Sequence, residues 1–378
     1  MIFFTSRFPF PLTKGDKLRA YYQIRDLSEK FDVYLLCTSD KHVSQADRDE
    51  LDRFCKEIHV FELKKVQIAF SMLLNFLTKK PFQVAYFHHY SIQKKVDSLL
   101  QKIRPDHIFT QLIRSSEYVK NYHDCPKTID YMDAFGKGME RRYETGVRFV
   151  RLIYKMESTR LKEYERKIFD YFEHHIIISK QDSEYILHPD YAKIKVVPNG
   201  IDNSFFDPQP IEKENDIVFV GNLSYEPNVQ ATEYLYKHIH RHNPSLKIQI
   251  SGASPLKRVL KLDASNFKIT GFIKDIRFAY SSGKIFVAPI FIGTGLQNKL
   301  LEAMAQGLPC ITTSLVNNAL GATENEEILI ANTQDEFLQA IQKLLSDEDL
   351  YAKLQSNARR FVYQNYAWKS INESIILD

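Results

Sequence analysis

Residues 293–309 read Gly-Thr-Gly-Leu-Gln-Asn-Lys-Leu-Leu-Glu-Ala-Met-Ala-Gln-Gly-Leu-Pro. The apolar run before them, 284–291, predicts a buried strand. Apolar residues then recur at helical spacing, which predicts a helix that stops at Gly307 and Pro309. A strand, a glycine turn and a helix in this order are typical of a parallel α/β domain. The predicted helix places four residues on one stripe: Leu296, Leu300, Ala303 and Met304.

The glycine turn of this stretch has the chemistry of a phosphate site. Gly293 and Gly295 allow the backbone to approach a ligand closely. The N-terminus of the following helix adds partial positive charge, and Lys299 adds a full one. Glu302, three residues later, supplies a carboxylate that can accept bonds from sugar hydroxyls. The pattern therefore predicts a site for a nucleotide diphosphate, although turns of this kind often only redirect the chain.

The same stretch resembles the donor-binding signature of retaining glycosyltransferases of family 4, which have the GT-B fold. The resemblance implies that Gly293, Gly295 and Lys299 hold the diphosphate and that Glu302 binds the ribose. It places three further residues in the donor site: Thr294, Leu296 and Gln297. Many family members carry a glutamate at the position of Thr294 that contacts the donor sugar. This departure leaves the identity of the sugar open.

Two further stretches carry the resemblance and imply the domain organisation. Residues 198–202, Pro-Asn-Gly-Ile-Asp, are similar to the link between the family's two domains, and 221–228 fit its Gly-x-Leu-x-Tyr-x-Pro-Asn pattern. We therefore expect an α/β protein of GT-B type, with two Rossmann-like doubly wound domains facing a central cleft. The expected parts are an acceptor-binding domain at 1–198, a nucleotide-sugar-binding domain at 199–360, and a helix crossing back to the first domain at 361–378.

Outside the signature, the resemblance indicates four more site residues. Gly15 follows the first predicted strand, where relatives carry a glycine pair; a solvated basic loop is the alternative reading of this segment. Phe272 and Ile273 lie where family members place backbone against the nucleotide base. Asp133 follows the strand 128–132, near the position of a histidine that contacts the donor sugar in many relatives. We expect a catalytic role for Asp133, Lys299 and Glu302, with capping of the next helix as the alternative for Asp133.

Residues 66–77 predict an unusual helix, because Gln67, Ser71 and Asn75 form a narrow polar stripe on an otherwise apolar segment between lysine pairs. One interpretation buries this helix in the N-terminal core. Another lays it in a lipid interface, where the lysines meet anionic head groups; binding to a partner chain is a third. The segment 137–167 carries ten basic and five acidic residues, an excess of 10 − 5 = +5. Such a surface suits a phosphate-bearing lipid acceptor.

Composition narrows the function classes. The 378 residues suggest two domains, and a net charge of +4 is too small to indicate nucleic acid. The four cysteines are scattered, so we expect buried free thiols and no metal site. No Gly-x-Gly-x-x-Gly follows the first strand, which disfavours an oxidoreductase. With no signal peptide or membrane-spanning run, we expect a cytoplasmic protein, and attachment to the inner face of the membrane stays open.

These observations predict a retaining, metal-independent, hexosyltransferase-like enzyme that needs no cofactor. Its donor would be a nucleotide sugar of UDP or GDP type. Its acceptor would be a glycan or a lipid-linked glycan, in the synthesis of cell-surface polysaccharide or glycoconjugate. The alternative is a non-catalytic homologue that binds a nucleotide sugar or a glycan.

Overall fold

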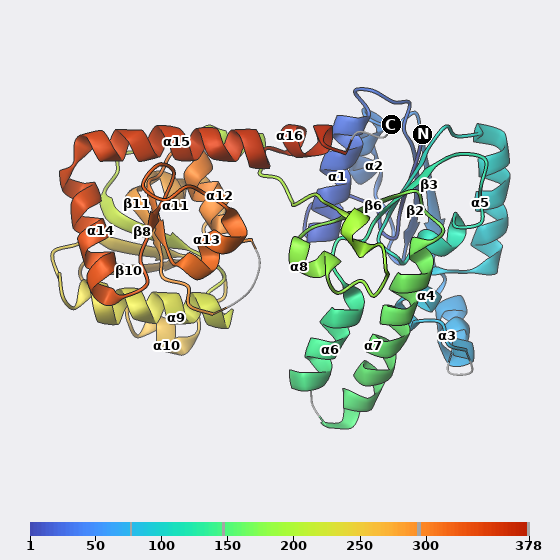
Figure 1. The fold of residues 1–378 in the computed structure, drawn as a ribbon, viewed down its shortest axis with the longest axis horizontal. Helices are drawn as coiled ribbons and strands as arrows, with labels where there is room; N and C mark the ends of the chain where they lie inside the picture. The colour runs from blue at the N-terminus through green and yellow to red at the C-terminus, as the bar shows by residue number, and fades with distance from the viewer. Residues whose placement is uncertain (76–77, 146–147, 293–295, 376–378) are drawn as a thin grey trace. The chain divides into compact units, whose positions relative to one another are not determined.

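The computed structural model describes residues 1–75, 78–145, 148–292 and 296–375. It divides into two compact units, each a parallel sheet flanked by helices (Figure 1). The first unit comprises Met1–Asn199 with the end of the chain from Ile371, and the second comprises Gly200–Ser370. The division thus falls inside the Pro-Asn-Gly link. The chain returns to the first unit at Ile371, later than the 361 expected from the sequence.

The sheet of the first unit has the strand order β3-β2-β1-β4-β5-β6-β7, and every pairing in it is parallel. The order reverses between β1 and β4, so these two strands form the topological switch point, where doubly wound sheets bind ligands. The strands are β1 (Ile2–Thr5), β2 (Tyr34–Ser39), β3 (Glu57–Glu62), β4 (Ile108–Gln111), β5 (Lys127–Asp130), β6 (His174–Ile177) and β7 (Lys195–Val196).

The helices of the first unit follow the strands and cover a core of buried aliphatic and aromatic side chains. Phe3 and Phe109 stack between neighbouring strands, with ring centroids 4.7 Å apart. The helices are α1 (Gly15–Leu27), α2 (Gln45–Asp52), α3 (Lys65–Leu74), α4 (Phe82–Phe87), α5 (Tyr90–Ile103), α6 (Phe135–Thr145), α7 (Arg148–Phe169) and α8 (Lys180–Ser183); α16 (Trp368–Glu373) follows the second unit.

The second unit repeats this architecture with the order β10-β9-β8-β11-β12-β13, again with parallel pairings throughout. Here the switch point lies between β8 and β11. The strands are β8 (Asn215–Val220), β9 (Ile248–Ser251), β10 (Phe267–Gly271), β11 (Gly283–Ala288), β12 (Cys310–Thr312) and β13 (Leu329–Ile330). The helices are α9 (Glu226–Tyr234), α10 (Lys257–Leu260), α11 (Arg277–Ser281), α12 (Asn298–Ala305), α13 (Ser314–Leu320), α14 (Gln334–Ser346) and α15 (Glu348–Tyr366).

Two local predictions in the second unit were wrong. Strand β11 ends at Ala288, because Pro289 has no N–H to continue the ladder, and Phe291 is 41% exposed. Helix α12 begins only at Asn298, so Leu296 precedes it and packs partly buried against the core. After β12 the chain forms helix α13, which ends where Gly321 adopts a left-handed φ of 75°.

Helix α3 contradicts the interpretation as a core helix. None of its ten residues, all of them described, is buried. Its polar stripe faces the protein: Ser71 Oγ donates to the Ala85 carbonyl at 2.8 Å, and the buried Asn75 beyond its end donates to the Lys80 carbonyl at 2.9 Å. Most of its large apolar side chains are exposed, with Val66 at 81% and Leu73 at 68%, while Ile68 packs partly buried against the core. The helix therefore bonds its polar stripe to the protein and leaves a wide apolar face, with Val66, Phe70, Leu73 and Leu74, exposed.

Candidate functional site

The main candidate site lies at the carboxyl ends of β8, β9 and β10, where three glycines allow the backbones of the strand ends to approach each other closely. The Gly221 N–H donates to the Ser251 carbonyl at 3.0 Å, and the Gly252 N–H donates to the Gly271 carbonyl at 2.8 Å. A Cβ on Gly252 would lie 1.7 Å from the Gly221 oxygen, and one on Gly221 would lie 2.7 Å from the Asn228 side chain. Only glycine fits at these two positions.

Asn228 connects this glycine edge to the signature helix. It is a buried residue in the first turn of α9. Its Nδ2 donates to the Asn222 carbonyl at 2.9 Å, which leaves its Oδ1 directed at Lys299. Lys299 Nζ, from α12, donates to this oxygen at 2.6 Å. The loop after β8 and the helix after β11 thus meet at the switch point of the sheet.

In the described part of the chain, the ammonium group of Lys299 donates hydrogen bonds only to neutral groups. Besides Asn228 it donates to Gln297 Oε1 at 3.1 Å, and its Nζ lies 5.7 Å from the centre of the Phe219 ring. Burial lowers the pKa of Lys299 to about 8, although the charge of Glu302 acts in the opposite direction. An anionic ligand would supply the countercharge that the lysine lacks.

Glu302 lies one turn further along α12 and is held by a tyrosine. Tyr280 of α11 is fully buried, and its hydroxyl donates to Glu302 Oε2 at 2.6 Å. Burial raises the pKa of Glu302 to about 7, while the Tyr280 hydrogen bond and the charge of Lys299 lower it. Glu302 as a residue is half-buried, and its second carboxylate oxygen has the chemistry to accept bonds from ligand hydroxyls.

Asn228 and Tyr280 were not among the residues predicted from the sequence. Asn228 was seen only as part of a resemblance pattern, and nothing around Tyr280 distinguishes it from an ordinary core tyrosine. They are 71 and 22 residues away from the groups they bind. In the sequence, only the Pro227-Asn228 pair at the start of a helix pointed to Asn228, and this pair does not indicate what the asparagine contacts.

The remaining donor-site predictions fall in three places. Gly293, Thr294 and Gly295 lie outside the described residues. Gln297 immediately precedes α12 and accepts the second Lys299 bond. Phe272 and Ile273 follow β10: Phe272 is 74% exposed, and Ile273 packs against the core beside an open hollow of about 630 Å³. The hollow is lined by residues 204–205 and 273–278.

The two predicted residues of the first unit, Gly15 and Asp133, both follow strands of its sheet. Gly15 is the exposed first residue of α1. Asp133 is exposed between β5 and α6; surrounding protein atoms, then the charges of Asp182 and Asp130, raise its pKa above the usual value. Nearby Asp130 is fully buried in an ion pair with Arg19 at 2.6 Å, and Gln23 also donates to it at 2.8 Å. Asp130 is therefore a structural residue of this edge.

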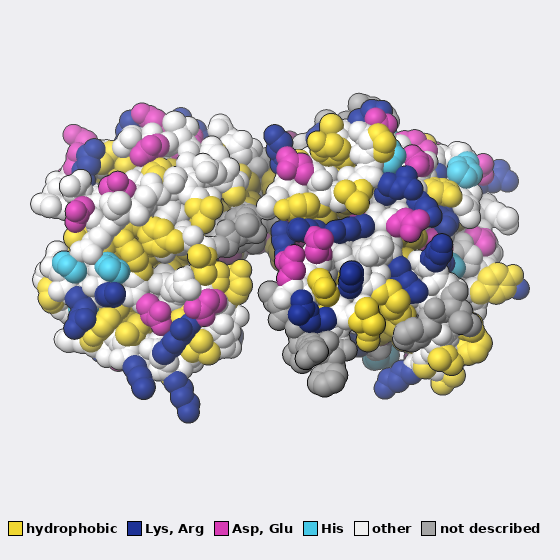
Figure 2. Space-filling model, turned by 60° about the horizontal axis from the view of Figure 1, so that its bottom comes forward, with side chains coloured by type: hydrophobic (Ala, Val, Ile, Leu, Met, Phe, Trp, Pro, Cys, Tyr) yellow, Lys and Arg dark blue, Asp and Glu magenta, His cyan; other side chains and the backbone are white. Residues whose placement is uncertain are grey.

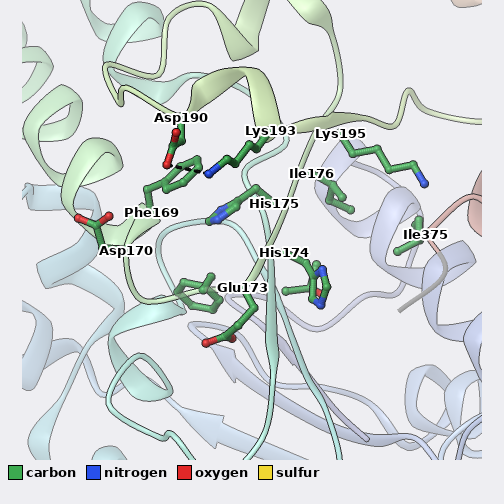
Figure 3. Close-up of a pocket in the computed structure, with 12 residues that line it drawn as sticks. Phe169, Asp170, Glu173, His174, His175, Ile176, Asp190, Lys193, Lys195 and Ile375 are labelled. Carbon is green, nitrogen blue, oxygen red and sulfur yellow. Dashed lines mark ion pairs between the residues drawn. The ribbon is translucent and has the colours of Figure 1, made fainter. Parts of the chain in front are cut away.

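Other features are separate from the candidate site. A cavity of about 430 Å³ in the first unit lies where β5 and β6 begin, the edge opposite to the one at which such sheets bind ligands (Figure 3). His175 lines it and stacks on Phe169, with ring centroids 3.7 Å apart.

Among the described residues, no group of three or more His, Cys, Asp and Glu side chains could hold a metal ion. The four cysteines are buried and free, as predicted. The chain's two Asp-x-Asp triplets lie in helical segments at 47–49 and 347–349.

Comparison with known proteins shows what the second unit and the whole chain are similar to. Residues 214–347 match the family model described as Glycosyl transferases group 1. The chain is 24% identical over 391 residues to an uncharacterized 44.6 kDa protein in the cps region of Klebsiella pneumoniae, covering 97% of this chain and 96% of that protein. It is 30% identical over 201 residues to the UDP-Gal:alpha-D-GlcNAc-diphosphoundecaprenol alpha-1,3-galactosyltransferase of Escherichia coli, covering 46% and 52% of the two chains.

Solved structures show the fold of the whole chain. The Anabaena protein Alr3699/HepE, solved in complex with UDP, superposes with a TM-score of 0.64 at 14% identity, covering 99% of this chain and 98% of that one. The chain therefore has the GT-B fold, and residues 214–347 of its second unit match the Glycosyl transferases group 1 model. The solved structures confirm the predicted fold class of two Rossmann-like α/β domains.

Proposed function

We propose that this protein is a retaining glycosyltransferase of family 4 that transfers a hexose from a UDP- or GDP-sugar to a lipid-linked glycan during synthesis of cell-surface polysaccharide. The observation that carries the proposal is Lys299, a partly buried ammonium bound to two neutral amide oxygens at the switch point of the second sheet. Family membership of this domain supports it, and so does the E. coli relative, whose name gives a UDP-sugar donor and a lipid-diphosphate acceptor.

In this proposal the donor diphosphate lies against Lys299 and the N-terminus of α12. The ammonium stabilises the negative charge that develops on the diphosphate as the glycosidic bond breaks. Glu302, positioned by Tyr280, accepts the ribose hydroxyls and fixes the nucleotide. Because the lysine and the helix supply the positive charge, we propose that the reaction needs no metal ion. Asp133, in the first unit, is proposed to have a catalytic role beside the donor sugar.

We further propose that the protein works in the cytoplasm on the inner face of the membrane, docked through α3. No helix in the described ranges is long and apolar enough to cross a bilayer. The outward apolar face of α3 is accompanied by the exposed lysines Lys64, Lys65 and Lys79. Hydrophobic side chains lie among many Lys and Arg on the face of the first unit shown in Figure 2. This combination matches an interfacial helix on anionic lipid.

The proposal is tested by calorimetric titration with a panel of UDP- and GDP-sugars, followed by transfer and hydrolysis assays in EDTA. We expect Lys299→Ala to weaken donor binding roughly 10- to 100-fold, because a charge-assisted phosphate contact of about 1.5–3 kcal/mol is lost. Glu302→Gln should raise the donor KM and leave the fold intact. Lys261→Ala, which removes an exposed lysine of the same unit, is the control.

Three outcomes separate the alternatives. Unchanged donor affinity in Lys299→Ala would rule out the diphosphate role. Donor binding without transfer or hydrolysis would favour a non-catalytic binding homologue. Activity that EDTA abolishes and Mg²⁺ restores would contradict the metal-independent reaction.

A further inference from the structure

Two arginines occupy the switch point of the first unit, the position that corresponds to the donor site of the second. Arg7 follows β1 by two residues, and Arg114 follows β4 by three. These strands are neighbours, and the strand order reverses between them. Ligands of doubly wound sheets bind at this point, beyond the carboxyl ends of the strands.

The two guanidinium groups share one aromatic ring. The central carbon of Arg7 lies 5.9 Å and that of Arg114 5.4 Å from the centre of the Phe87 ring. Arg114 also lies over Phe135, at 4.7 Å, and donates from Nε and Nη2 to Gln83 Oε1 at 3.1 and 2.5 Å. The rings and the amide hold the guanidinium in place but leave its charge uncompensated.

Positive charge exceeds negative charge around this pair. Arg7 donates to Asp16 Oδ2 at 2.6 Å, while no described carboxylate hydrogen-bonds Arg114. Burial, and next the charge of Arg7, lower the pKa of Arg114 to about 10; Asp16 raises it and Arg142 lowers it further. An anion between the guanidinium groups would relieve this repulsion. Planar guanidinium forks match phosphate oxygens in a bidentate manner.

Backbone strain marks the same edge independently of charge. Leu112, directly after β4, has a φ of 66°, and Met132, just after β5, has a φ of 58°. Each such conformation costs a residue other than glycine free energy, and strained residues of this kind cluster at ligand sites. The Leu112 N–H donates to the Asp130 carbonyl at 2.7 Å, so the turn that leads to Arg114 is tied to the neighbouring strand.

We propose that Arg7 and Arg114 form a binding site for the phosphate or diphosphate group of the acceptor. This inference rests on the proposed function, and it assigns the acceptor to the class of phosphate esters. The phosphate belongs either to a lipid-linked glycan or to a soluble glycosyl phosphate. Both sources present the same anion to the arginines.

The test is a titration of full-length protein with inorganic pyrophosphate and with farnesyl diphosphate. It uses the Lys299→Ala background, so that the donor site contributes little. Adding Arg7→Gln or Arg114→Gln should each weaken pyrophosphate binding about tenfold, whereas Arg166→Gln, an exposed arginine of α7, should change nothing. Arg114→Lys, which keeps the charge, should recover part of the affinity, and thermal melts show whether each variant is folded.

Binding that is unchanged in folded Arg7→Gln and Arg114→Gln would overturn the site. Tighter binding of farnesyl diphosphate than of pyrophosphate assigns the site to a lipid-linked acceptor, and equal binding assigns it to a soluble phosphate ester. Titration of a UDP-sugar into Arg7→Gln with Lys299 intact should give wild-type affinity. If wild-type protein ignores every nucleotide sugar but binds pyrophosphate through the arginines, the proposed function fails and the anion site stands.

Discussion

At the residue scale, the candidate site contains two ionisable groups of opposite charge, and uncharged side chains position both of them by hydrogen bonds. Lys299 is held by the side chains of Asn228 and Gln297, and Glu302 by Tyr280. Burial disfavours the charged form of each, so both titrate near neutral pH. Donor binding is therefore expected to depend on pH through these two residues.

We expect UDP to bind most tightly between about pH 7 and pH 8. Lys299 is charged below its pKa of about 8 and loses its charge as the pH rises through it. Glu302 is ionised above its pKa of about 7 and is protonated as the pH falls through it, which weakens the ribose contact. Binding above pH 8 should take up a proton, because the diphosphate favours the charged lysine.

Calorimetry from pH 6 to 9, in buffers with different ionisation heats, measures both the affinity and the proton uptake. Lys299→Arg is the matched control, since a guanidinium stays charged over this range. The alkaline decline in affinity should disappear in that variant. An alkaline decline that persists in Lys299→Arg would assign the titration to another group.

At the element scale, the ends of the strands determine the candidate site more than the strand interiors do. The alternation of strands and helices was sufficient to predict two parallel sheets, because the apolar runs and glycine turns are local signals. The contact between Gly221 and Gly252 was not predictable. It joins the ends of two strands in space, and no local pattern reports which backbone atoms approach each other. The same reasoning explains why the sequence indicated Lys299 but missed Tyr280.

Replacing Gly252 tests this contact. The Cβ of Gly252→Ala would fall 1.7 Å from the Gly221 oxygen, at a φ of 153°. We expect the free energy of unfolding to fall by at least roughly 1–3 kcal/mol, the usual cost of such strain. UDP affinity should fall too, because Gly221 leads into the loop that carries Asn228. Urea denaturation and UDP titration measure the two effects.

Gly138→Ala in α6 is the control, since an added Cβ there meets no atom within 4 Å. It should leave UDP binding unchanged and stabilise the helix by about 0.5–1 kcal/mol. Equal stability of wild type and Gly252→Ala would mean that the two strand ends can move apart at no cost.

At the scale of the whole molecule, α3 is the feature whose environment the sequence left open. A narrow polar stripe on an apolar helix has the same pattern whether it faces water or protein. The structure resolves this, because the stripe is bonded to the protein: Gln67 to Ser91, Ser71 to the Ala85 carbonyl and Asn75 to the Lys80 carbonyl. Arg160 of α7 donates to the carbonyls of Asn75 and Lys80 as well, which fixes the end of this segment. Val66, Phe70, Leu73 and Leu74 are then left exposed on the outer face of the helix.

A second apolar group supports the idea that this part of the unit meets a lipid surface. Leu152 and Ile153 of α7 are 76% and 46% exposed, and α6, α7 and α3 all project from the lower part of the unit as drawn in Figure 1. The four lysines at the ends of this segment, Lys64, Lys65, Lys79 and Lys80, are not equivalent. Lys80 pairs with the buried Glu117 at 2.6 Å, which leaves Lys64, Lys65 and Lys79 exposed for lipid head groups.

We therefore expect wild-type protein to co-sediment with vesicles that contain anionic lipid and to dissociate as salt rises. Each basic residue near such a surface contributes about 1 kcal/mol, so replacing Lys64, Lys65 and Lys79 by Gln should weaken binding strongly at low salt. Phe70→Ser with Leu73→Ser should weaken it at every salt concentration, because the loss is apolar, without changing thermal stability. Leu187→Ser, an exposed apolar residue of the same unit, is the control. If wild-type protein does not bind anionic vesicles at low salt, or if the Phe70 and Leu73 changes unfold it, the outward face of α3 is not a membrane-docking surface and the acceptor must be reached from solution.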